Sequence, residues 1–120
     1  MSDNTLKDAF IYDGIRTPFG RHAGALAPVR PDDLLAHTIK SVIERNSFPK
    51  QAYEDVIAGN TNQAGEDCRN VARFASLLAG MPTEVGGLTV NRLCASVLAA
   101  TLHAANSVKI GEGDLFVAGG

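Results

Sequence analysis

The 120-residue sequence predicts an α/β domain built on a largely parallel sheet. Short apolar runs, typical of strands, alternate along the chain with longer segments whose apolar residues recur at helical spacing. Gly and Pro residues separate these segments, and neither a repeat nor a low-complexity stretch interrupts them. Strands that helices cover on both faces form parallel sheets, so helices are expected on both sides of this one.

The first half of the chain opens with a predicted strand at residues 9–13, an apolar run that Gly14 ends. A loop containing Pro and Gly follows over residues 16–31, and loops of this length in compact domains often carry function. The first helix is expected over residues 31–46, because acidic residues occupy its first turn and apolar residues then recur at helical spacing.

The middle of the chain predicts a second strand at residues 55–59, with a glycine at its exit, and then a polar loop. A second helix is expected from about Cys68 until Gly80 and Pro82 terminate it. The third strand is predicted at residues 88–92.

Cys94 is expected to open the third helix, which continues to residue 110. This helix is apolar almost all round, a pattern typical of a helix buried on most sides. A fourth strand at residues 114–118 brings the chain to its end. Because functional loops normally follow the carboxyl edge of a parallel sheet, we interpret residues 1–120 as one truncated domain.

Composition excludes several kinds of function. The formal net charge is −2 with 45% hydrophobic and 20% charged residues, as in ordinary soluble proteins. The basic residues are scattered, which argues against nucleic acid as a partner. The apolar stretches are expected to fall short of the ~20 residues that span a membrane, and the N-terminus shows no signal pattern. A cytoplasmic protein with two free thiols is the expectation.

Cys94 is the strongest candidate for chemistry. Backbone N–H groups and the helix dipole favour negative charge where a strand meets the helix that follows it. A thiol there is favoured as the thiolate, its nucleophilic form, and the same N–H groups can donate to an oxyanion. The alternative is a buried cysteine that acts as a small apolar residue. Cys68 is interpreted as structural, because Glu66 and Asp67 oppose a thiolate.

The three histidines carry no motif. His22, His37 and His103 are dispersed, and ordinary surface or core histidines are the interpretation for them. With two separated cysteines, no pair of residues has metal-ligand spacing, so no metal site is expected.

A resemblance to a known family emerges from the motifs in combination. The segment VNRLCAS at residues 90–96 resembles the active-site signature of thiolases, in which the cysteine accepts an acyl group. Further segments resemble the same family in the same order: IRTPFGR at 15–21, NQAG at 62–65, NVAR at 70–73, AGMP at 79–82, GE at 111–112 and VAGG at 117–120. The segment GALAPVRPDDL at residues 24–34 is most similar to the 3-oxoadipyl-CoA (beta-ketoadipyl-CoA) thiolase branch.

The resemblance implies a layered αβαβα fold of two similar halves, of which this chain is the N-terminal one, and assembly as a homodimer or homotetramer. The third helix would lie between two sheets. Cys94 would attack the ketone carbon of a 3-oxoacyl-CoA, release acetyl-CoA and hold the remaining acyl group as a thioester. Coenzyme A, a substrate, would then take that group. The resemblance implies no metal or redox cofactor.

The sequence also departs from the family pattern. Val97 stands where thiolases usually have Gly. Its branched side chain is expected to crowd the interior and to cost about 1–3 kcal/mol of stability unless something compensates. The family's catalytic histidine, oxyanion segment and second cysteine match nothing here. An alternative is therefore a catalytically silent fragment or interaction module, and a lesser one is another condensing enzyme of the thiolase superfamily. The apolar sheet edge is expected to promote association.

Overall fold

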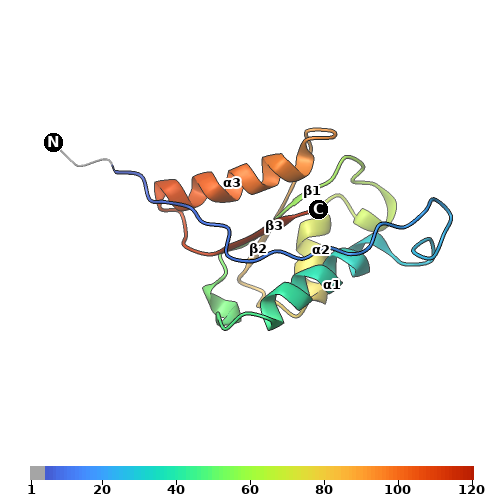
Figure 1. Cartoon of the computed structure of the whole chain (residues 1–120), viewed down its shortest axis with the longest axis horizontal. Coiled ribbons are helices and arrows are strands. Elements are labelled where there is room, and N and C mark those ends of the chain that lie inside the picture. The colour runs from blue at the N-terminus through green and yellow to red at the C-terminus, as the bar shows by residue number, and fades with distance from the viewer. Residues whose placement is uncertain (1–4) are drawn as a thin grey trace.

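Three parallel strands form the sheet at the centre of the computed structural model, which describes residues 5–120 (Figure 1). β1 (Asp55–Gly59) lies between β2 (Gly86–Val90) and β3 (Phe116–Gly119). Ile57 in β1 is in register with Leu88 on one side and Ala118 on the other. The predicted α/β class and parallel sheet are confirmed, and β1 has the predicted bounds.

Helices cover both faces of this sheet (Figure 1). α1 (Pro31–Glu44) and α2 (Val71–Leu78) lie on one face, and α3 (Ser96–Ile110) lies on the other. Side chains alternate along a strand, so Val56 and Ala58 join the core under α1 and α2, while Ile57 packs against α3. Two short 3₁₀ helices, η1 (Lys50–Ala52) and η2 (Gly65–Asp67), complete the connections.

The prediction of a strand at residues 9–13 is wrong. Nothing in the described part of the chain pairs with this segment as a strand, and Phe10 and Ile11 are 85% and 87% exposed. A strand needs a neighbouring strand for its backbone groups, and apolar content alone does not supply one. The described sheet therefore has three strands rather than four.

Two contacts hold this N-terminal segment against the end of α1. Asp13 accepts hydrogen bonds from Arg45 Nε at 2.9 Å, from Arg45 Nη2 and from Asn46 Nδ2 at 2.9 Å. Tyr12 meets Phe48 edge to face, with ring centroids 5.0 Å apart. The hydrogen bonds from Arg45, followed by that from Asn46, hold the pKa of Asp13 below its usual range.

The boundaries of four other elements differ from the predictions. α2 begins at Val71 instead of Cys68, because Cys68 and Arg69 have left-handed φ values of 50° and 67°. β2 begins and ends two residues earlier than predicted, since Gly86 pairs with Asp55 and the chain turns after Val90. β3 is Phe116–Gly119 rather than residues 114–118, and α1 ends at Glu44 rather than near residue 46.

α3 is less buried than its composition predicts. Ala100 and Ala104 pack on the sheet, whereas Leu98 and Leu102 on the outer face are 61% and 52% exposed. By length and composition alone, one stretch within residues 5–120, Leu93–Ile110, is able to cross a membrane; the core helix of a soluble protein passes the same test. The expectation that every apolar stretch falls well short of that length does not hold for this one.

Candidate functional site

Cys94 lies in the turn between β2 and α3, at the carboxyl edge of the sheet. β2 ends at Val90 and α3 begins at Ser96, so Cys94 precedes the helix by two residues rather than opening it. Its thiol is free and exposed, which removes the interpretation of a buried apolar cysteine. The positive end of the α3 dipole lies directly after it in the chain.

The backbone of this turn is unusual. Leu93, the residue before Cys94, has a left-handed φ of 50°, a conformation that branched side chains rarely adopt. The backbone then closes on itself, because Ala95 N–H donates to the Arg92 carbonyl at 3.1 Å and Ser96 N–H donates to the Leu93 carbonyl at 3.0 Å. A tight turn therefore separates the strand from the helix and carries Cys94 at its exposed side.

Two side chains complete the hydrogen bonding of the turn. Ser96 Oγ accepts from Arg92 N–H at 2.8 Å and donates to the Leu93 carbonyl at 2.6 Å. Asn91 Oδ1 accepts from Leu93 N–H at 2.9 Å, and Asn91 Nδ2 donates to the Thr61 carbonyl at 3.3 Å. Sequence reasoning did not assign these residues. The signal for them is the Asn and Ser positions around a strand end, because both side chains readily bond nearby backbone groups.

Gly59 allows β1 to approach this turn closely. A Cβ at residue 59 would overlap with the carbonyl group of Ser96 and the backbone nitrogen of Val97. The absence of a side chain therefore lets the end of β1 lie directly against the first residues of α3. Val97 itself does not crowd the described part of the chain, as the residue is 43% exposed.

A polar loop borders the turn at the same edge of the sheet. Asn60 N–H donates to the Val90 carbonyl at 2.9 Å, and Asn60 Nδ2 donates to Asp67 at 2.9 Å. From the other side, Arg30 forms ion pairs with Asp32 at 3.0 Å and Glu66 at 3.5 Å. The hydrogen bond from Arg30 lowers the pKa of Asp32.

The remaining candidates are not assembled around Cys94. The three histidines are exposed, and throughout residues 5–120 no side chain hydrogen-bonds to the Cys94 thiol. The charge of His103 acts instead on Asp55, at the opposite edge of the sheet. Burial raises the pKa of Asp55, against the smaller lowering effects of the Val56 N–H and His103. Cys68 is a free, exposed thiol in the loop before α2.

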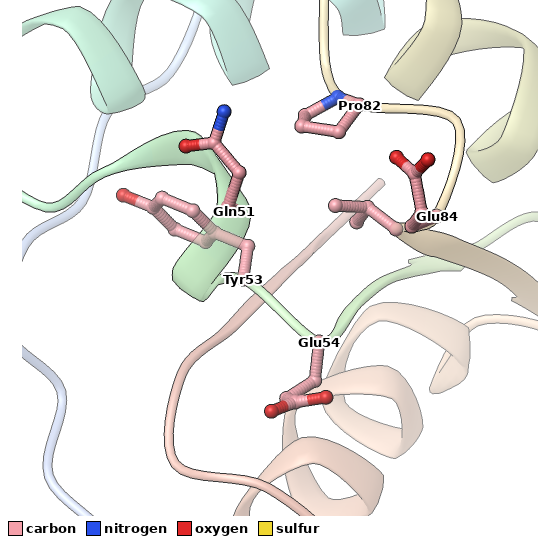
Figure 2. Close-up of a pocket in the computed structure, with 6 residues that line it drawn as sticks. Gln51, Tyr53, Glu54, Pro82 and Glu84 are labelled. Atoms are coloured by element: carbon pink, nitrogen blue, oxygen red, sulfur yellow. The ribbon is translucent and has the colours of Figure 1, made fainter.

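A pocket of about 310 Å³ lies at the amino edge of the sheet, away from Cys94 (Figure 2). Tyr53 and Glu54 precede β1, and Pro82, Glu84 and Val85 precede β2. Figure 2 shows that the carboxyl groups of Glu54 and Glu84 point in different directions, so they do not form an acid–base pair. No cluster of three metal-ligating side chains occurs in the described residues, here or elsewhere.

A larger groove of about 1400 Å³ runs between the N-terminal segment, β3 and α3. Residues 8–17 form one wall, and Val97 and Thr101 contribute from α3. The groove also reaches Gly59 and Asn60, which places it beside the turn that carries Cys94.

Comparison with known proteins places this geometry in context. The family profile described as "Thiolase, N-terminal domain" matches residues 9–120. The chain is 54% identical over 116 residues to the 3-oxoadipyl-CoA/3-oxo-5,6-dehydrosuberyl-CoA thiolase of Escherichia coli (strain K12). It is 57% identical over 116 residues to a beta-ketoadipyl-CoA thiolase of Acinetobacter baylyi. Each alignment covers 96% of this chain and 29% of the relative, so the chain spans less than a third of these relatives' length.

Solved structures show the same fold. The acetyl-CoA acetyltransferase of Bacillus anthracis superposes with a TM-score of 0.91 at 30% identity, over 98% of this chain and 30% of its own. The Acat5 thiolase of Ascaris suum, solved in complex with coenzyme A, superposes with a TM-score of 0.88 at 31% identity, over 94% of this chain and 30% of its own. The resemblance identified from the motifs is therefore confirmed, including the 3-oxoadipyl-CoA branch.

Proposed function

Since the chain belongs to the thiolase family, an enzyme family, we propose that it carries the acyl-accepting nucleophile of a thiolase-type acyltransferase, and that this nucleophile is Cys94. One observation carries the proposal. An exposed, unpaired thiol stands on a rigidly hydrogen-bonded turn at the start of a helix, at the carboxyl edge of a parallel sheet. That edge is where α/β proteins place their ligands.

The reaction has two steps. The Cys94 thiolate attacks the ketone carbon of a 3-oxoacyl-CoA, and the positive end of α3 favours the oxyanion that forms. The carbon–carbon bond to the acetyl-CoA unit then breaks, and its enolate takes up a proton. In the second step the coenzyme A thiolate attacks the Cys94 thioester and releases the Cys94 thiolate with a shortened acyl-CoA.

The substrate class follows from the relatives. Their names specify 3-oxoadipyl-CoA, so the substrate proposed for the whole protein is a 3-oxoacyl-CoA with an acidic acyl chain. Coenzyme A is the proposed acyl acceptor, in line with the neighbour solved with coenzyme A.

A hybrid enzyme tests the role of Cys94. The present chain replaces the matching 116 residues of the Escherichia coli relative, and the hybrid is incubated with a 3-oxoacyl-CoA. Mass spectrometry is expected to find the acyl group on the peptide containing Cys94. Cys94→Ala is expected to abolish labelling, while Cys68→Ala, the matched change at the other thiol, retains it. Labelling of the Cys94→Ala hybrid at the parent level contradicts the proposal.

The second candidate is that the 120-residue chain alone is catalytically silent. It is favoured because no side chain of residues 5–120 is hydrogen-bonded to Cys94 as a base. Losing general acid–base help costs a factor of about 10²–10⁴ in rate. The purified chain is therefore expected to show no thiolysis above background, and clear turnover contradicts this.

A further inference from the structure

The turn before Cys94 contains a backbone conformation that its sequence does not favour. Leu93 adopts a left-handed φ of 50°, although glycine and asparagine are the residues that enter this region easily. Leu93 gains little from burial in compensation, because the residue is 70% exposed. Strained residues of this kind persist only where surrounding contacts determine them, and they gather at functional sites.

Ser96 supplies the contacts that determine this conformation. Its side chain is buried within α3's first turn, with the residue only 3% exposed. Its hydroxyl uses both of its capabilities on the turn, because the oxygen accepts from Arg92 N–H and the O–H donates to the Leu93 carbonyl. One bond holds the peptide group that follows the left-handed residue, and the other holds the peptide group before Arg92. Asn91 adds a third, by accepting from Leu93 N–H.

We propose that Ser96, assisted by Asn91, is the positioning residue of the nucleophile: its hydroxyl holds Leu93 left-handed, so that the Cys94 thiol stays at the positive end of α3. Ser96 does not touch the substrate. The inference rests on the proposed role of Cys94, but it concerns the geometry of the turn and is measured without any acyl-CoA.

Alkylation of the two thiols measures this geometry. The chain is treated with limiting iodoacetamide, and peptide mass spectrometry gives the rates for Cys94 and Cys68 in the same molecule. In Ser96→Ala the turn loses both hydroxyl bonds, and the Cys94 rate is expected to fall about two- to fivefold as the thiol leaves the helix dipole. Opening of the turn in the variant cannot raise the Cys94 rate by exposing the thiol, because Cys94 is already exposed in the wild type. The Cys68 rate is expected to stay unchanged.

Two further variants separate positioning from stability. Ser107→Ala removes a hydroxyl from the same helix at similar burial, 4% exposed, and should leave the ratio of Cys94 to Cys68 rates at its wild-type value. Asn91→Ala changes an exposed residue, so it tests the turn even if Ser96→Ala fails to fold. It should lower the Cys94 rate in the same direction.

The outcomes are distinct. A wild-type ratio in both Ser96→Ala and Asn91→Ala overturns the proposal, and so does an equal rise at both thiols, which indicates general loosening. If the ratio falls as expected while the hybrid enzyme acquires no acyl group on Cys94, the proposed function fails and the positioning role stands. If acylation occurs and the ratio does not change, the positioning role alone is refuted.

Discussion

The close contact between β1 and α3 predicts a large effect for one added methyl group. In Gly59→Ala, the new Cβ would overlap with backbone atoms of Ser96 and Val97 rather than with the end of a flexible side chain. Backbone atoms cannot rotate away, so α3 must move from the sheet or β1 must bend. Overpacking of this kind costs about 1–3 kcal/mol of unfolding free energy.

Thermal unfolding followed by circular dichroism measures this cost. For a chain of this size about 1 kcal/mol corresponds to roughly 4 °C, so Gly59→Ala is expected to lower Tm by about 4–12 °C. Gly119→Ala is the matched control, since Gly119 lies on neighbouring β3 and a Cβ there meets nothing within 4 Å. Its Tm should stay level or rise slightly, because alanine restricts the unfolded chain.

The same pair of variants also tests whether the contact between β1 and α3 affects Cys94. Because Ser96 closes the turn around Cys94, Gly59→Ala should also slow Cys94 alkylation relative to Cys68, and Gly119→Ala should not. A Tm for Gly59→Ala equal to the wild-type value contradicts the close approach of β1 to α3. An equal loss of stability in Gly119→Ala shows that glycine itself, rather than the contact, is what matters.

Two other predictions concern stability. The pKa of Asp13 is lowered in the folded chain, so its stabilising effect is complete above the unfolded carboxyl pKa of about 4 and is lost as pH falls below it. The Tm difference between wild type and Asp13→Asn should therefore be full at pH 7 and shrink below pH 4; a difference that does not vary with pH contradicts the ion pair. Asn70 caps α2 by accepting from Arg73 N–H at 3.3 Å. It also joins the helix to β2, because it accepts from Thr89 Oγ1 at 2.7 Å and donates to the Gly87 carbonyl at 2.9 Å. Asn70→Ala should cost about 1–3 kcal/mol in denaturant unfolding, whereas Asn106→Ala, an exposed change on α3, should cost almost nothing.

Local patterns in the sequence were sufficient for the parts of the fold that depend on local physics. β1 was predicted with its observed bounds, because a run of apolar residues ending in glycine has few alternatives to a buried strand. The start of α1 was predicted from its proline and acidic first turn. Cys94 was placed between a strand and a helix for the same reason, since the spacing of apolar residues changes around it from that of a strand to that of a helix.

Tertiary contacts decided the rest. Residues 9–13 have the composition of a strand, but strand formation requires a partner backbone, which no local pattern encodes. The composition of α3 showed that it is apolar and could not show which of its faces is covered. The sequence by itself thus determined the α/β class and the family, and it singled out Cys94 as the proposed nucleophile. Only the tertiary structure decided where the turn carrying Cys94 lies, because the end of β1 packs directly against the first residues of α3, where Gly59 has no side chain to keep them apart.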